Sequence, residues 1–275
     1  MPKNQSVDLH VHSVYSDGKL PPAELAALAE KHNVSALAIT DHDTLAGADE
    51  KLAACREREI ECVAGVELSC ELDGRETHVL SLFCDPGSRH AGRMEDVSRS
   101  REQRMQLMLD KLAGLGVRLE LSDLAAGDEG IYGRPHLARA LVQRGVVKSV
   151  GEAFARYLYD GGPVCVEKRR LAAAEGIALA KDLGGAAVIA HAGVSGLLED
   201  LDRLAEMGLD GVEVYHPKHD GGVVARLLSY CRGRKLLVSG GSDFHSPGDG
   251  AELGSAKAPP DILEPLRELA AARKG

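Results

Sequence analysis

The sequence predicts an α/β protein in which β/α units repeat along most of the chain. Short apolar runs alternate with helical patterns over residues 7–83 and again over residues 171–273. Such repeats favour a parallel sheet wrapped by helices. The number of units suits a (β/α) barrel better than an open sheet. No G-x-G-x-x-G turn is present, which argues against a dinucleotide-binding fold.

The first part of the predicted barrel contains four strands and two helices. Apolar runs predict the strands at residues 7–11, 35–40, 60–68 and 77–83. Helical spacing predicts the helices at residues 23–32 and 44–58, the first of them opened by Pro21 and Pro22. The dipeptide Asp73-Gly74 predicts a tight turn between the third and fourth strands.

Residues 87–166 are predicted to form a mainly helical insertion that covers the active site, and residues 1–86 and 167–275 to form the barrel. Helices are expected over residues 94–115, up to residue 144 and near 152–159. The apolar stripe of the first one is interpreted as packing. After the insertion, helices expected at 171–183, 197–207, 223–232 and 262–273 alternate with strands at 186–190, 211–215 and 236–239.

Composition narrows the classes of function. Apolar residues make up 44% of the 275, enough for a globular core. No apolar run reaches transmembrane length and no signal peptide opens the chain, so we expect a cytoplasmic protein without a membrane partner. The six cysteines lack C-x-x-C spacing and are expected to be reduced. The net charge of −9 argues against a grip on long nucleic acid but allows a small anionic substrate.

Ionisable side chains gather at the ends of the predicted strands. His10 and His12 lie two apart in an extended run, so their imidazoles face the same point. The other strand-end candidates are Asp41, His42, Asp43, Glu67, His78, His191, His216, Asp243 and His245. Any one of them has a structural alternative, such as a buried histidine paired to a carbonyl. Together they indicate a metal site at the active face of a barrel, with ligands that suit Mn²⁺, Fe²⁺ or Zn²⁺.

With these residues in hand, the chain resembles the polymerase and histidinol phosphatase (PHP) family along nearly its whole length. The matching segments are 8–13 (DLHVHS), 15–18 (YSDG), 39–44 (ITDHDT), 65–69 (GVELS), His78, 189–191 (IAH) and 241–245 (GSDFH). The resemblance implies a distorted seven-stranded (β/α) barrel that holds two or three divalent metal ions.

The resemblance also implies how the ligands are shared among the metals. One metal would take His10, His12, Glu67 and Asp243. A second would share Glu67 and take His78 and His191, and a third would take His42 and His245. Some relatives supply a further histidine to the third metal, and Asp17 is the substitute expected here.

The segment 133–141 (GRPHLARAL) resembles the small stand-alone members, which are phosphoesterases of 3′,5′-nucleoside bisphosphates and short oligonucleotides. We therefore expect a phosphorylated substrate of that kind and attack on phosphorus by a hydroxide that bridges two metals. The residues expected to serve catalysis are Glu67, Asp243 and His191. Arg134 is the expected phosphate ligand, with a surface ion pair as its alternative. His136, His216 and His219 are further candidates for substrate contact, and structural packing is the alternative for each.

Other functions remain open at this point. Histidinol phosphate hydrolysis is a second phosphatase reaction of the same family. C–N hydrolysis of the amidohydrolase type also uses an H-x-H strand, but its dinuclear members often bridge the metals with a lysine, and residues 77–83 contain none. A metal-stabilised binding module without catalysis is the non-enzyme alternative. The sequence does not indicate the oligomeric state.

Overall fold

The computed structural model describes residues 5–124, 132–166, 170–248 and 250–274. Its strands belong to one sheet, and seven of them follow one another in the order β1-β2-β3-β4-β6-β7-β8, with the short β5 beside β3. These strands are β1 (Ser6–Val11), β2 (Val34–Ile39), β3 (Glu61–Leu72), β4 (Arg75–Leu82), β5 (Leu171–Ala172), β6 (Ala186–Ile189), β7 (Gly211–Tyr215) and β8 (Leu237–Gly240). The α/β class and the path of seven strands agree with the sequence prediction.

The sheet is mostly parallel, with one strand reversed. The pairs β1–β2, β2–β3, β6–β7 and β7–β8 are parallel, whereas β4 runs antiparallel to both β3 and β6. The reversal begins at Asp73-Gly74, where both residues have positive φ (52° and 76°), as a two-residue hairpin turn requires. The predicted turn is confirmed. The reversed strand carries His78 toward the same side of the sheet as the ends of the parallel strands.

The two ends of the sheet meet through the segment that follows β8. The Asp243 amide donates to the His10 carbonyl at 2.8 Å, and the His12 amide donates to the Phe244 carbonyl at 2.9 Å. The buried carboxylate of Asp8 accepts from the amides of Ser242 (2.8 Å) and Gly254 (2.7 Å). Within the described residues β8 itself does not pair with β1, so a closed barrel is not shown; loop residues join the two edges instead.

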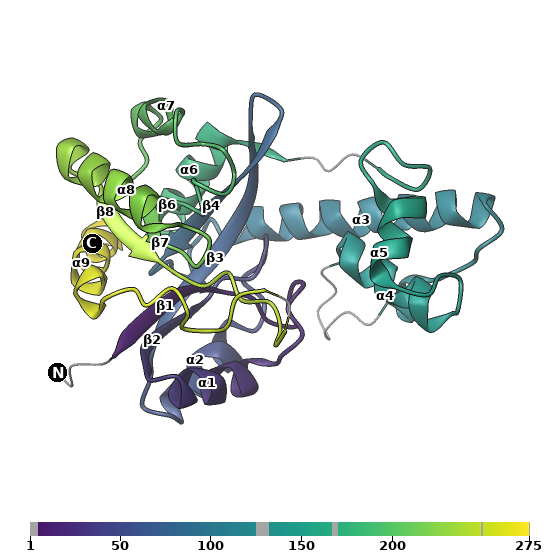
Figure 1. Cartoon of the computed structure of the whole chain (residues 1–275), viewed down its shortest axis with the longest axis horizontal. Coiled ribbons are helices and arrows are strands. Elements are labelled where there is room, and N and C mark those ends of the chain that lie inside the picture. The colour runs from purple at the N-terminus through teal and green to yellow at the C-terminus, as the bar shows by residue number, and fades with distance from the viewer. Residues whose placement is uncertain (1–4, 125–131, 167–169, 249, 275) are drawn as a thin grey trace.

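Helices cover the outer surface of the sheet (Figure 1). They are α1 (Pro22–Lys31), α2 (Ala48–Arg56), α6 (Ala173–Asp182), α7 (Leu201–Glu206), α8 (Gly221–Arg234) and α9 (Leu263–Lys274), the last preceded by the 3₁₀ turn η3 (Pro260–Ile262). Leu25 and Ala29 of α1 pack with Leu37 and Ile39 of β2, as the helical spacing of their apolar residues predicts. Helix α6 approaches the sheet closely at Gly176, where a Cβ would lie 2.1 Å from Cys70 Sγ.

The remaining helices form a lobe, which consists of the long helix α3 and the short helices near its far end (Figure 1). They are α3 (Gly92–Gly114), η1 (Leu121–Asp123), α4 (Arg134–Gln143), α5 (Val150–Ala153) and the π turn η2 (Phe154–Leu158). The stripe on α3 packs against α4 in an apolar cluster separate from that of the sheet, with Met105, Met108, Leu109, Leu112, Leu137 and Leu141 among its members. The stripe is therefore packing. The expected border at residue 167 falls outside the described residues.

Some predicted bounds differ from the observed ones. Helix α2 begins at Ala48 because Gly47, with φ 67°, precedes it in the left-handed region. Strand β3 continues four residues past its predicted end at residue 68, because its outer half pairs with β4. None of the helices that the structure describes is both long and apolar enough to cross a membrane.

Candidate metal centre

A single buried carboxylate, that of Glu67, lies at the centre of the site. Glu67 stands within β3, so it is surrounded by the ends of neighbouring strands. Its two oxygens lie 2.9–3.3 Å from the nitrogens of five imidazoles, those of His10, His12, His42, His78 and His191. Since the residue is 0% exposed, water does not compete for these contacts. The arrangement allows one carboxylate to bridge two cations.

The histidines of the first strand meet Asp243 as well as Glu67. His10 Nε2 lies 3.2 Å from Glu67 Oε1 and 3.6 Å from Asp243 Oδ1. His12 Nε2 lies 3.2 Å from Glu67 Oε2 and 3.3 Å from Asp243 Oδ1. Asp243 reaches this position because the segment after β8 lies along β1. The convergence that the H-x-H spacing predicts is therefore present.

A second group of possible ligands surrounds Asp17. Its oxygens lie 3.3 Å from His245 Nε2, 3.7 Å from His12 Nδ1 and 3.9 Å from His42 Nε2. One ligand atom from each of these four side chains lies within 4.8 Å of the others. Asp17, the residue that the family resemblance offers as a substitute ligand for a third metal, thus lies beside His12, His42 and His245.

All nine residues predicted as metal ligands come together, although their grouping differs in part. The most compact sets are His10, His12 and Glu67; His42, Glu67 and His78; and His12, Asp17, His42 and His245. His42 was expected with the third metal alone, yet its Nδ1 is 3.0 Å from Glu67. It therefore lies between two of the sets. His191, expected with His78, lies 3.3 Å from it.

The arrangement of the donor atoms suits a metal ion better than it suits hydrogen bonds among the side chains themselves. His10 Nε2, His12 Nε2, His42 Nδ1 and Glu67 Oε2 are buried and make no hydrogen bond among the described residues. Buried polar atoms are normally satisfied, so such a concentration of exceptions needs a cause. Imidazole nitrogens and carboxylate oxygens around one point are the ligand set of Mn²⁺, Fe²⁺ and Zn²⁺ sites.

Electrostatics in the metal-free site also point to cations. Burial would raise the pKa of Glu67, but His42, His10 and His78 hold it well below its usual range. Burial would lower the pKa of His12, yet its contacts with Asp243 and Glu67 raise it to about 10. The pKa of His10 is likewise raised, against burial, by Glu67, Glu213 and Asp243. The carboxylates around His10 and His12 therefore favour positive charge at this point, as a bound cation would supply it.

Glu213 was not among the predicted site residues, but it fixes two of them. The side chain is 0% exposed and lies in β7. One of its oxygens is 3.0 Å from His10 Nδ1, and the other accepts the His191 amide at 2.7 Å. A carboxylate on the far nitrogen of a ligating imidazole fixes its tautomer and raises its basicity. The signal in the sequence was a glutamate inside an apolar strand.

Asp41 supports the segment that carries Asp17. Its oxygens accept from Ser13 Oγ and Ser16 Oγ, both at 2.6 Å, and from Lys51 Nζ at 2.7 Å. All four of these side chains are buried. Asp41 therefore acts through its neighbours and does not belong to the ligand sets.

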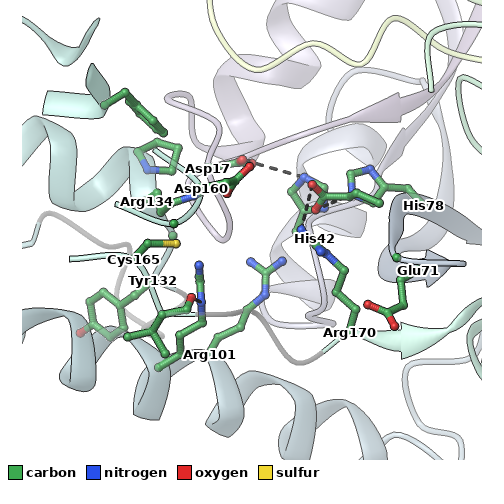
Figure 2. A pocket seen from close by; sticks show the side chains of 18 residues that line it. Asp17, His42, Glu71, His78, Arg101, Tyr132, Arg134, Asp160, Cys165 and Arg170 are labelled. Atoms are coloured by element: carbon green, nitrogen blue, oxygen red, sulfur yellow. Dashed lines mark hydrogen bonds and ion pairs between the residues drawn. The ribbon is translucent and has the colours of Figure 1, made fainter. Parts of the chain in front are cut away.

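The site opens into a cavity of about 580 Å³ between the sheet and the helical lobe (Figure 2). Asp17, His42 and His78 border it on one side. Four arginines border it too, namely Arg101, Arg104, Arg134 and Arg170. Repulsion from the other three, added to burial, lowers the pKa of Arg104. Glu71, Glu76 and Asp160 line the cavity as well, so an anion that approaches the ligand cluster would meet guanidinium groups of which several already face carboxylates.

Three of these arginines are held by carboxylates. Arg101 lies 2.5 Å from Asp43, Arg170 lies 3.1 Å from Glu76, and Arg134 lies 2.5 Å from the exposed Asp160. Arg134 also donates to the Leu158 carbonyl at 3.1 Å. It both lines the cavity and makes an ion pair, so the two roles weighed from the sequence coexist. Arg104 donates to the Val166 carbonyl at 2.7 Å and, among the described residues, is in no ion pair.

The other three residues predicted to contact substrate do not line this cavity. His136 is buried at the start of α4, where its Nδ1 accepts the Gly133 amide at 3.1 Å. His219 binds backbone through both nitrogens, with the Val214 carbonyl at 3.0 Å and the Gly193 amide at 3.2 Å. The geometry of His219 favours packing over the expected substrate contact. His216 accepts the Lys218 amide at Nδ1, so a neutral ring carries its proton on the buried Nε2.

Two of the site residues have a strained backbone. Asp243 has φ 54° and His191 has φ 31°, both in the region that favours glycine. Such conformations cost about 1–3 kcal/mol each and persist only where surrounding structure imposes them. Here the bonds of Asp243 N to His10 O and of His191 N to Glu213 impose them.

Comparison with known proteins gives full-length matches. A profile of the PHP domain matches residues 8–158. A 5′–3′ exoribonuclease from Haemophilus influenzae is 34% identical over 270 residues, which cover 95% of this chain and 97% of the relative. A 3′,5′-nucleoside bisphosphate phosphatase from Chromobacterium violaceum is 32% identical in an alignment of 283 positions, gaps included, that covers 97% of each chain.

Solved structures agree in fold. A protein from Bifidobacterium adolescentis, assigned as a metal-dependent phosphoesterase, superposes with a TM-score of 0.85 at 31% identity, over 98% of this chain and 97% of that one. A protein from Chromobacterium violaceum described as an amidohydrolase, with bound sulfate and no metal, superposes with a TM-score of 0.81 at 30% identity, over 98% and 96% of the two chains.

The first prediction concerns Glu213. In Glu213→Gln one carboxylate oxygen is replaced by an NH2 group, which donates and cannot accept a hydrogen bond, so the contact with His10 Nδ1 or with the His191 amide is lost. We expect metal affinity to fall roughly 10- to 100-fold, as for other partners of metal-bound histidines. Competition with a fluorescent chelator measures it. Unchanged affinity, with an unchanged melting temperature, would show that Glu213 does not orient His10.

The second prediction concerns pH. Neighbouring carboxylates raise the pKa of His10, and they raise that of His12 to about 10, so both imidazoles favour a proton wherever no cation takes its place. Metal ligation requires neutral imidazoles, so binding must displace these protons and weaken as pH falls. Titration calorimetry in buffers of different ionisation enthalpy should show release of about one to two protons at pH 7. Proton uptake, or affinity independent of pH between 6 and 8, would contradict this.

Proposed function

Because the chain belongs to the PHP domain family, we propose that this metal-dependent phosphoesterase hydrolyses phosphate esters of nucleotides, namely 3′,5′-nucleoside bisphosphates and short oligonucleotides. The single observation that carries the proposal is the position of the ligand cluster around Glu67, at the wall of a cavity lined by four arginines. Both full-length relatives named above act on nucleotide phosphates, one as a phosphatase and one as an exoribonuclease.

We propose that two or three divalent cations occupy the site, held by the nine residues that converge there. When bound, such cations lower the pKa of water and neutralise the charge that develops on phosphoryl oxygens. Glu67 joins the sets, since both of its oxygens face imidazoles. Asp243 and His191 would serve catalysis by holding the cations next to the scissile phosphate. Glu213 keeps His10 in the tautomer whose Nε2 is free to ligate.

The arginines would bind and orient the substrate. A nucleoside bisphosphate carries a second phosphate in addition to the one cleaved, and guanidinium groups bind phosphate through paired hydrogen bonds. Arg104 is the strongest candidate, since its charge is not paired with a carboxylate among the described residues. Arg134 can exchange the exposed Asp160 for phosphate at small cost, because an ion pair with one exposed partner contributes little to the stability of the fold.

Histidinol phosphate is the alternative substrate, and it differs in charge. It has a single phosphate and a cationic amine, so it lacks the second phosphate that Arg104, which is in no ion pair among the described residues, could bind. C–N hydrolysis has less support, because a carboxylate, Glu67, occupies the bridging position and no lysine stands in β4.

The third prediction tests the reaction. Protein loaded in turn with Mn²⁺, Fe²⁺ or Zn²⁺ should release phosphate from 3′,5′-adenosine bisphosphate and mononucleotides from short oligonucleotides, with little product from histidinol phosphate. Asp243→Ala should lose metal and activity together while it stays folded, because it removes a group that faces His10 and His12. His90→Ala, a histidine outside the site, is the control. Undiminished turnover in chelator-treated protein would overturn the proposal.

The fourth prediction concerns Arg134. Arg134→Ala removes a cation from the cavity without touching the metal ligands, so kcat/KM for the bisphosphate should fall roughly 10- to 100-fold at constant metal content. Arg134→Lys should recover part of the loss. Arg144→Ala is a matched control, because Arg144 caps the same helix and pairs with Asp123 outside the cavity. If Arg134→Ala and Arg144→Ala behave alike, Arg134 does not bind phosphate.

A further inference from the structure

A second, smaller cavity of about 250 Å³ reaches the same ligand cluster from another side. Asp17, Asp243 and His245 of the cluster border it, whereas His42 and His78 border the larger cavity. At about 30 Å³ for each water, its volume corresponds to roughly eight waters, well beyond the needs of a single bound solvent molecule. The cluster is therefore accessible from two directions.

The start of α4 separates the two cavities. Pro135 lines both of them, and Asp17 is the other residue they share. Arg134 lines the larger cavity and Arg139 the smaller one. Residues five apart on a helix differ by about 140° around its axis, so these two arginines leave α4 on different sides. One helix thus supplies a cation to each cavity.

Lys218 provides a second cation in the smaller cavity. It lies in the loop after β7, between His216 and His219. Hydrogen bonds fix the conformation of that loop, because His219 binds backbone groups through both ring nitrogens and the Lys218 amide donates to His216 Nδ1. The lysine side chain itself is exposed, so it can reach a ligand without disturbing the core. The two acidic residues of the cavity, Asp17 and Asp243, belong to the ligand cluster and would be neutralised by bound cations.

The two substrate types differ in what the scissile phosphorus carries. In a monoester it bears one esterified oxygen, and one cavity is enough for the group attached to that oxygen. In a phosphodiester it bears two, and the groups attached to them must leave the cluster in different directions. From this geometry we propose that the smaller cavity, through Arg139 and Lys218, binds the part of an oligonucleotide beyond the scissile phosphate. This assignment rests on the proposed function and extends it to a second binding subsite.

The proposed cleavage then follows from the two subsites. A water oxygen forms a bond to phosphorus, and the bond from phosphorus to the oxygen of the nucleotide in the larger cavity breaks. That oxygen takes up a proton, and the phosphate stays on the remaining chain. The shortened chain therefore begins with a phosphate, which the arginines of the larger cavity can bind in the next round. Both the diester and the monoester reactions use the same cluster.

The test compares both substrates on the same variants. The metal-loaded enzyme is assayed with 3′,5′-adenosine bisphosphate and with 5′-phosphorylated tri- and tetranucleotides, by chromatography of the released mononucleotide. Lys218→Glu and Arg139→Gln should lower kcat/KM for the oligonucleotides roughly tenfold and leave the bisphosphate within about twofold. Removing a phosphate contact should also reduce the salt dependence of oligonucleotide cleavage by about 0.7–1 in log–log slope.

Two further variants sharpen the comparison. Lys218→Arg should recover oligonucleotide cleavage, since it restores the charge. Lys31→Glu, at an exposed position in the last turn of α1, reverses a charge away from the site and should change neither substrate. Equal effects of Lys218→Glu on both substrates, or a wild type that cleaves only the bisphosphate, would overturn the second subsite and leave the phosphoesterase function standing. Failure on both substrates would overturn the proposed function itself.

Discussion

The site depends on one arrangement, a fully buried carboxylate in contact with five imidazoles. Glu67 would be very costly to bury alone, because a carboxylate loses its hydration inside the protein. Contacts with the imidazoles offset that cost, and the fold must bring them from four separate stretches of chain. The central place of β3 in the sheet makes this possible, since strand ends on both sides reach Glu67. A cation that enters the cluster would replace protons, so metal binding is coupled to the charge balance of the buried site.

The helical lobe completes the site without supplying any of the nine converging ligands. Its own apolar cluster holds α3 and α4 together, which keeps the arginines in place while the sheet holds the ligands. Asp43 connects the two parts: its carboxylate accepts the Ser69 amide at 2.6 Å and lies 2.5 Å from Arg101. The division suggests how substrate preference can vary within one family.

Much of this could be predicted from the sequence, for identifiable reasons. Strands were recognisable as apolar runs, and polar residues that interrupt or end such runs, such as His10 and Glu67, marked the site. The reversed β4 followed from a turn dipeptide. The grouping of His42 could not be predicted, because it depends on how neighbouring strands align. Glu213 lies in the middle of its predicted strand at residues 211–215, so the pattern of ionisable residues at strand ends did not include it. His219 lies close to candidate ligands in sequence, yet the loop after β7 directs its ring to backbone groups.

The strained backbone at Asp243 and His191 has a consequence for the evolution of the protein. Glycine would relieve the left-handed conformation at either position, and its lack of a side chain would remove a group from a crowded, highly charged centre. Selection for thermal tolerance alone would thus favour losing the very residues that face the metals. Stability and activity pull in opposite directions here. Selection of more thermostable variants of this chain should therefore include a measurement of bound metal at every round of selection.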